Sequence, residues 1–260
     1  MRPEWREKTH LPKHLQDAVA VFCEKIEKSE GDNLVSIVLY GSAVKGGFNQ
    51  YTSDINVVLV LEEASIEALD RLAGVIHYGA QEYGIGVMVS EPQDLDRSTD
   101  VFPIKFRDIQ RHYVILSGED LIEELEIEET HLRLRCEQEM KNLMWRMRYF
   151  YLHRKHRAEQ VEGTLMSVTS EFLTATETLL YLETGESFTS KQDIVNAAVR
   201  ELEYPKSLLK KLLSMKQTKL KPNADELREL YKQLMELVTY AADLADRWEA
   251  DDEDDDEDDE

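Results

Sequence analysis

The 260-residue sequence lacks several features that mark particular classes of protein. It has only two cysteines, Cys23 and Cys136, and neither a disulfide framework nor a zinc cluster is expected from them. No apolar run approaches the roughly 18–20 residues that cross a bilayer, and the charged N-terminus has no apolar stretch behind it. We therefore expect a cytoplasmic protein without a membrane partner.

Basic residues are also scarce, with 31 Lys and Arg against 53 Asp and Glu and a formal net charge of −22. The run 249–260 holds 11 acidic residues and no basic one, so it cannot bury apolar area and is predicted to be a disordered tail. This balance disfavours a global attraction to nucleic acid. Basic residues still gather within 146–157 and 206–221, so a nucleic-acid partner stays open without being favoured.

The pattern of apolar residues changes along the chain. Before Gly118 lie short runs rich in β-branched residues, and after it the apolar residues recur at helical spacing. Strands are predicted at 34–40, 55–61, 85–90 and 101–106, and helices at 15–26, 64–83, 132–156, 164–183, 191–203, 207–215 and 224–248. The predicted fold class is α+β: a small mixed β-sheet domain flanked by helices, then an all-α helical bundle and the acidic tail. The expected domains are 1–125, 126–248 and 249–260.

The segment between the first two strands carries the chemistry. Gly41 permits a sharp turn directly after a strand, and Ser42 begins a short helical turn whose free N–H groups could hold phosphate oxygens. Asp54 opens the next strand, and residues 54 and 56 face the same side because side chains alternate along a strand. Two acids placed in this way would chelate a divalent metal at a nucleoside triphosphate.

Gly41-Ser42, followed by Ser53-Asp54-Ile55-Asn56, resembles the signature of the DNA polymerase β nucleotidyltransferase superfamily. The texture is similar to aminoglycoside nucleotidyltransferases and bacterial nucleotidyltransferase-domain proteins, over roughly residues 34–118. The resemblance implies transfer of a nucleoside monophosphate from an NTP to an acceptor, with Mg²⁺ held by acids in an Asp-x-Asp pair and a third acid on a later strand.

This sequence departs from that pattern. Asp54 fills the first acid position and would bind the metal, but Asn56 replaces the second acid and brings no negative charge. The predicted strand 101–106 places Lys105 where we expect the third acid, and its ammonium could instead hold a phosphate. If the third acid lies elsewhere, the candidates are Glu91, Asp100 and Asp108. Nucleotide and phosphate binding is assigned to Gly41, Ser42, Lys45, Ser53 and Lys105.

Three functions remain open from the sequence. The first is an enzyme that transfers a nucleoside monophosphate to an unknown acceptor, with its activity impaired by the substitutions at 56 and 105. The second is a pseudoenzyme that keeps the nucleotide pocket and acts by binding a nucleotide, RNA or protein. The third is a partner of RNA or of a helical protein.

Overall fold

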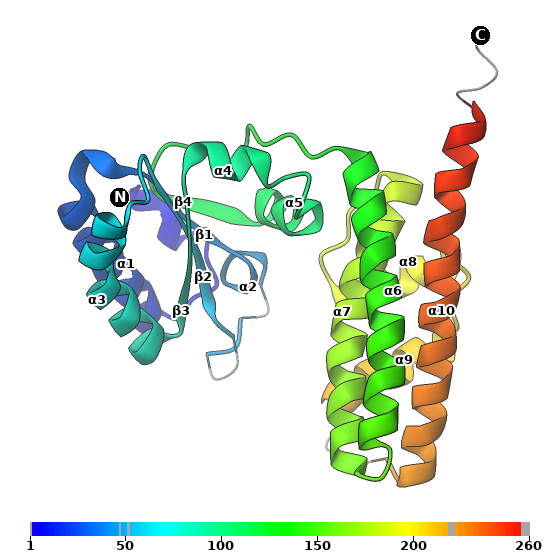
Figure 1. Ribbon diagram of the computed structural model, residues 1–260. Coiled ribbons are helices and arrows are strands. Elements are labelled where there is room, and N and C mark those ends of the chain that lie inside the picture. The colour runs from blue at the N-terminus through cyan, green and yellow to red at the C-terminus, as the bar shows by residue number, and fades with distance from the viewer. Residues whose placement is uncertain (1, 47, 51–52, 218–221, 256–260) are drawn as a thin grey trace. The chain divides into compact units, whose positions relative to one another are not determined.

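The protein divides into two compact units, Met1–Glu128 and Glu129–Glu260 (Figure 1). The computed structural model describes residues 2–46, 48–50, 53–217 and 222–255. The first unit contains both helices and strands, whereas the described residues of the second unit contain helices and no strand. The predicted α+β class, a mixed sheet domain followed by a helical region, is confirmed.

A four-stranded sheet in the order β3-β2-β1-β4 forms the centre of the first unit. Strand β1 pairs antiparallel with β2 and β4, and β2 pairs parallel with β3, so the sheet is mixed. The predictions for 34–40, 55–61 and 85–90 are confirmed, and strand β4 was missed. The strands are β1 (Leu34–Tyr40), β2 (Ile55–Leu61), β3 (Ile85–Ser90) and β4 (Tyr113–Gly118).

The fourth predicted strand, 101–106, is wrong. Pro103 begins helix α5 (Pro103–Arg111), where its missing N–H costs nothing because the first helical N–H groups have no intrahelical partner. Phe106 and Ile109 are three residues apart and both buried, which is helical spacing. The true fourth strand follows directly at β4, and its Tyr-Val-Ile-Leu run carries the β-branched and aromatic signal of a strand.

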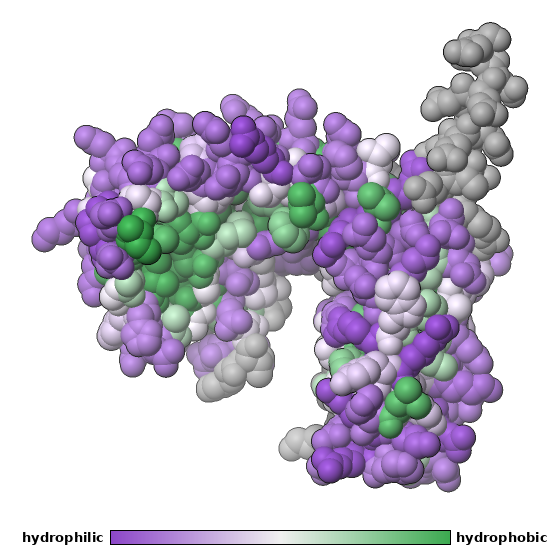
Figure 2. All heavy atoms as spheres, viewed as in Figure 1, coloured by the Kyte–Doolittle hydropathy of each residue, from purple (hydrophilic) through white to green (hydrophobic). Residues whose placement is uncertain are grey.

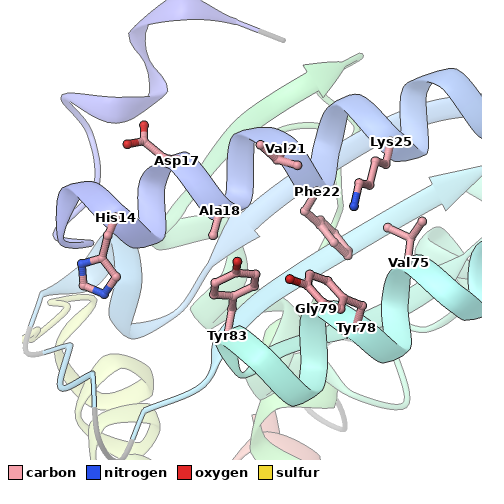
Figure 3. A pocket seen from close by; sticks show the side chains of 10 residues that line it. All are labelled: His14, Asp17, Ala18, Val21, Phe22, Lys25, Val75, Tyr78, Gly79 and Tyr83. Carbon is pink, nitrogen blue, oxygen red and sulfur yellow. The ribbon is translucent and has the colours of Figure 1, made fainter.

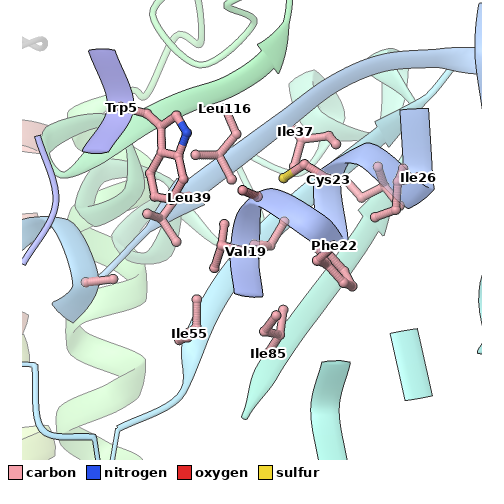
Figure 4. Close-up of a cluster of buried hydrophobic side chains, with 14 of the residues drawn as sticks. Trp5, Val19, Phe22, Cys23, Ile26, Ile37, Leu39, Ile55, Ile85 and Leu116 are labelled. Atoms are coloured by element: carbon pink, nitrogen blue, oxygen red, sulfur yellow. The ribbon is translucent and has the colours of Figure 1, made fainter. Parts of the chain in front are cut away.

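Helices α1 and α3 cover one face of the sheet and bury its main core (Figure 4). Alternate residues of β1, Ile37 and Leu39, meet Val19, Cys23 and other apolar side chains of α1. The opposite face holds a second cluster, in which Val38, Val58 and Ile115 pack with residues of α4 and α5. The remaining helices of this unit are η1 (Pro3–Arg6), α1 (Lys13–Glu30), η2 (Gly31–Asn33), α2 (Ser42–Lys45), α3 (Ile66–Tyr83) and α4 (Pro92–Arg97).

The second unit is a bundle in which the long helices α6, α7 and α10 pack along one another, with shorter α8 and α9 against them (Figure 1). The Tyr231 hydroxyl donates to the Met147 carbonyl at 2.6 Å, and the Phe172 and Tyr204 rings stack at 5.7 Å. None of the helices among the described residues is long and apolar enough to cross a membrane. The helices are α6 (Glu129–Arg154), α7 (Ala158–Thr184), α8 (Lys191–Glu201), α9 (Lys206–Gln217) and α10 (Ala224–Asp255).

Helix α10 differs from expectation at its C-terminal end. The acidic run from 249 is predicted to be disordered, yet α10 continues through it to Asp255. Four of the seven residues from 249 to 255 are aspartates, which favour a helix only weakly, so the extension is best explained by propagation of α10, which is easier than nucleating a new helix. Residues 256–260 lie outside the described part of the chain.

Candidate functional site

The turn after β1 is built as the sequence predicts. Gly41 has φ 75° and ψ −146°, a combination that L-residues rarely adopt, and it precedes the one-turn helix α2. The backbone N–H groups of Val44 and Lys45 both donate to the Gly41 carbonyl, at 2.9 and 2.8 Å. The N–H groups of Ser42 and Ala43 belong to the first turn, for which an α-helix offers no intrahelical acceptor.

Asn56 lies next to this turn on the neighbouring strand. It pairs with Tyr40 across the antiparallel β1–β2 ladder, and a Cβ built on Gly41 would lie 3.2 Å from the Asn56 Nδ2 atom. The predicted strand–turn–strand arrangement of residues 34–61 is therefore confirmed. Asn56 is half-buried and lies on the face of the sheet opposite α1 and α3.

On its other side, Asn56 pairs with Gly86 of the parallel strand β3. A Cβ built on Gly86 would lie 3.7 Å from the Asn56 Oδ1 atom, which is an ordinary van der Waals distance. A side chain at position 86 would thus project beside Asn56 on the same face of the sheet. An acid at position 86 could therefore reach Asn56, and the residue there is glycine.

Asp54 and Ser53 lie just before β2. A Cβ built on Gly84 would lie 3.8 Å from the Asp54 Oδ1 atom, so the exposed Asp54 carboxylate is next to the start of β3. The Ser53 hydroxyl accepts a hydrogen bond from the backbone N–H of Asn49 at 3.1 Å. Both residues line a cavity of about 580 Å³, which is also bordered by His14, Leu15, Phe48, Gln50, Glu82, Tyr83 and Gly84.

Lys45 does not stand alone at the end of α2. Its ammonium Nζ lies 3.0 Å from the Asp108 carboxylate of α5, and the Asp108 carboxylate lies 3.5 Å from His112 Nδ1. Partial burial raises the pKa of the Asp108 carboxyl, but the hydrogen bonds and charges of His112 and Lys45 outweigh it and lower that pKa to about 2. The His112 carbonyl accepts from the Gly41 N–H at 3.2 Å, which connects this cluster to the turn.

Lys105 lies on a helix and not on a strand, so the alternation that placed it at the third acid position does not apply. Its exposed Nζ lies 3.0 Å from the Met88 sulfur, two residues beyond Gly86 on the same face of β3. The alternative acids do not fill the position either. Glu91 accepts from the Ala64 N–H at 2.8 Å beyond the far end of β3, and Asp108 is paired with Lys45. Asp100 lies in the exposed turn before α5.

A second cavity, of about 310 Å³, opens between α1 and α3 and adjoins the first, since His14 and Tyr83 border both (Figure 3). Its aromatic side is formed by Tyr78 and Tyr83, whose rings meet edge to face at 5.9 Å. The Lys25 ammonium lies 5.3 Å from the centre of the Tyr78 ring. This side of the first unit therefore offers an apolar, aromatic hollow near Asp54.

The donor set does not fit the pair of magnesium ions that the resemblance implies. Asp54 offers one carboxylate, Asn56 offers a neutral amide oxygen, and Gly86 offers no side chain. Hard cations prefer charged oxygen ligands. Across the described ranges, no group of three or more His, Cys, Asp or Glu side chains is arranged to hold a metal ion.

Sequence reasoning missed Gly86 and His112. A glycine inside an apolar strand pattern is a signal in itself, because it weakens the strand and often marks a close approach. Nothing in the sequence pattern could have paired Gly86 with Asn56, since that pairing depends on the register between two strands joined by helix α3. The link from His112 to Gly41 likewise depends on the β1–β4 pairing.

Comparisons with known proteins bear on the fold of the chain. No family model matches the chain. A curated protein of Methanocaldococcus jannaschii, provisionally described as a protein adenylyltransferase, is 30% identical over 88 residues, which are 32% of this chain and 59% of that protein. This chain therefore spans less than two thirds of the length of that relative.

A crystal structure of the spectinomycin adenyltransferase from Enterococcus faecialis, determined with ATP and spectinomycin, superposes with a TM-score of 0.52 at 16% identity. The match covers 84% of this chain and 98% of that one, so it extends into both units. The chain has the fold of the nucleotidyltransferases. The predicted resemblance to that superfamily is confirmed.

Proposed function

We propose that this chain binds a nucleoside triphosphate at the Gly41–Ser42 turn and that its capacity to transfer a nucleoside monophosphate is strongly reduced or lost. The nucleotidyltransferase fold supports the first part. The pairing of Asn56 with Gly86 carries the second, because two adjacent positions that could hold acids, at the same end of the sheet as Asp54, have an amide and a glycine.

The reduction has a physical cause. In a nucleotidyl transfer, divalent ions neutralise the triphosphate and the charge that develops as the α-phosphate is attacked. Mg²⁺ needs near-octahedral oxygen coordination, and one carboxylate with the phosphates of the nucleotide and water can hold a single ion. A second ion would have no carboxylate ligand, because neither position 56 nor position 86 is an acid. Asp54 is therefore the residue on which any remaining metal binding depends.

Lys45 adds a positive charge to this turn that it shares between the Asp108 carboxylate and a bound phosphate. Its side chain is 30% exposed, and its own backbone N–H donates to the Gly41 carbonyl, so the ammonium belongs to the same turn that would receive the phosphates. Asp108 and His112 hold it in place. A lysine acts as a compact point charge, which suits phosphate binding without a metal. Ser53 shapes the approach to Asp54, and Lys105 adds a further cation near β3.

Retained transfer activity is the second candidate, since the names of both relatives describe adenylyl transfer. In that case Asp54 holds the metal with help from Asn56, and the acceptor, whose identity is unknown, approaches the cavities beside Asp54. The two candidates differ in their dependence on metal.

Calorimetric titration of the full chain with ATP, in Mg²⁺ and in EDTA, separates them. We expect ATP binding that changes less than about threefold on chelation, and no release of pyrophosphate. The double variant Asn56→Asp/Gly86→Glu restores both acids and should bind ATP at least about tenfold more tightly in Mg²⁺ than in EDTA. The matched control, Asn56→Asp/Gly86→Gln, has nearly the same volume and one charge fewer, and it should gain much less.

Lys45→Met tests the cation separately. It should weaken ATP binding by about tenfold in EDTA, the scale of one lost charge-assisted hydrogen bond. Metal-dependent pyrophosphate release by the natural chain, abolished by Asp54→Ala, would replace the proposal with the active-enzyme candidate. Absence of ATP binding under both conditions would refute nucleotide binding itself.

A further inference from the structure

Helix α6 carries an exposed aromatic and apolar stripe that the nucleotidyltransferase fold does not account for. Trp145, Tyr149 and Leu152 are 60%, 56% and 71% exposed, and their spacing of four and three residues puts them on one face of the helix. The opposite face of α6 is buried against α7 and α10 through residues such as Met140 and Met147. Figure 2 shows pale and green spheres among the purple ones along this helix. These large side chains are therefore not needed for the core of the bundle.

Cations flank this stripe, which we define as Trp145, Tyr149 and Leu152. Arg148 and Lys155 are seven residues apart and thus share one flank, about 10 Å apart along the axis. Helical hydrogen bonding reaches that far, since the Lys155 N–H donates to the Tyr151 carbonyl at 3.0 Å. Within the described residues neither cation forms an ion pair, and both are exposed. On the other flank the His153 ring packs against the Tyr149 ring at a tilt of 32°, with centroids 4.1 Å apart.

Among the described residues, two neighbouring cations, unlike Arg148 and Lys155, interact with other side chains of the bundle. Arg146 forms a two-point ion pair with Glu171, at 2.5 and 3.2 Å. The Arg154 guanidinium lies 4.1 Å from the centre of the Phe150 ring and donates to Thr164 at 2.9 Å. These two arginines stabilise the bundle. Arg148 and Lys155 remain as the charges available to a ligand.

From this arrangement we infer that the stripe on α6 binds single-stranded nucleic acid. Exposed aromatic rings stack with unpaired bases, and flanking cations contact the phosphates between them. A chain with net charge −22 offers such a partner little general attraction, so binding must depend on this local group. The inference is independent of nucleotide binding by the first unit.

The described part of the acidic run, up to Asp255, does not lie on the stripe. Helices α6 and α10 are antiparallel: Tyr231 contacts Met147, while Asp246 lies 2.9 Å from Lys141, nearer the start of α6. Beyond Asp246, α10 continues to Asp255, so its described acidic end leads away from the stripe. The proposed partner of the exposed rings and cations is a separate nucleic-acid molecule.

Fluorescence anisotropy of the full chain with labelled oligouridylate and oligothymidylate of about 15 nucleotides tests this inference. We expect binding in the micromolar range at about 50 mM salt, weakening steeply as salt is raised. Trp145→Ala/Tyr149→Ala should weaken it at least tenfold through lost stacking. Arg148→Glu/Lys155→Glu should weaken it at low salt and flatten the salt dependence. All four positions are exposed, so the fold should be kept.

The matched control is Lys210→Glu/Lys211→Glu, which makes the same change in charge at exposed positions of α9 and should leave binding unchanged. Three results would overturn the inference. The first is that neither oligonucleotide binds up to about 100 µM. The second is that the α9 control loses as much oligonucleotide affinity as the stripe variants do. The third is that the stripe variants abolish binding of anionic lipid vesicles while oligonucleotide binding persists.

Discussion

Two glycines of the sheet, Gly118 at the end of β4 and Gly86 in β3, are present for different physical reasons. Gly118 has φ 81°, and a Cβ there would lie 1.9 Å from the Val35 carbonyl oxygen of the neighbouring strand. Gly86 has no positive φ, and a Cβ there would make only the 3.7 Å contact with Asn56. The backbone therefore requires glycine at 118 and does not require it at 86.

This difference bears on function. A glycine in a strand interior costs backbone entropy and removes a side chain that could pack, so it needs a reason. At position 86 the backbone supplies none. Its one clear consequence is that nothing projects beside Asn56 on the face where acids would hold a metal. The comparison thus shows that an acid introduced at position 86 would meet no obstacle from the backbone.

The largest expected effect in this comparison is at Gly118. Gly118→Ala should destabilise the protein by more than about 4 kcal/mol, because the new methyl group can be placed only if β1 and β4 separate. Urea denaturation followed by circular dichroism measures this loss. A change below about 1 kcal/mol would show that the β1–β4 contact relaxes easily and would weaken the contrast between the glycines.

An intermediate effect is expected at Gly41, where φ is 75° but the nearest atom is the end of a side chain, Asn56 Nδ2 at 3.2 Å. Gly41→Ala should cost about 1–3 kcal/mol, mainly from the strained backbone, since the Asn56 amide can shift. The double variant Gly41→Ala/Asn56→Ala removes the close contact and isolates the backbone cost. Full recovery of stability in that double variant would contradict a backbone origin.

The smallest effect on stability is expected at Gly86. Gly86→Ala should leave the free energy of unfolding unchanged or raise it by up to about 1 kcal/mol, because alanine loses less entropy than glycine on folding. The same denaturation experiment serves here, with Gly118→Ala as the reference. A loss above about 2 kcal/mol would mean that position 86 is sterically closed, and restoring an acid there would no longer be a fair test.

Acid titration sharpens the assignment of Asp108 as a structural partner of Lys45. The folded-state pKa of Asp108 lies at about 2, below the ordinary 3.8, so the ion pair stabilises the fold above that ordinary value. This contribution should fade as the pH falls from about 4 to 2, and Asp108→Asn should remove the pH dependence over that window. An unchanged acid profile in Asp108→Asn would show that the pair does not stabilise the fold.

Much of the fold followed from local patterns, and the errors have local causes as well. The runs at 34–40, 55–61 and 85–90 are continuous and β-branched, and each forms a strand within the predicted limits. The strand prediction for 101–106 relied on the alternation of side chains and gave too little weight to Pro103, which begins a helix. That error assigned the expected third-acid position to Lys105. The face on which a side chain lies depends on whether its segment is a strand, which repeats every two residues, or a helix, which repeats about every 3.6 residues.

The sequence by itself indicated a nucleotidyltransferase-like domain. The signal was a strand followed by Gly41-Ser42 and then Asp54 directly before a second strand. A sharp turn and a carboxylate at adjoining strand ends depend mainly on local chemistry. Tertiary structure decided which residue stands beside Asn56. Strands β2 and β3 are parallel and separated by helix α3, so their register is set by packing between distant segments, and only that packing brings Gly86 to the site.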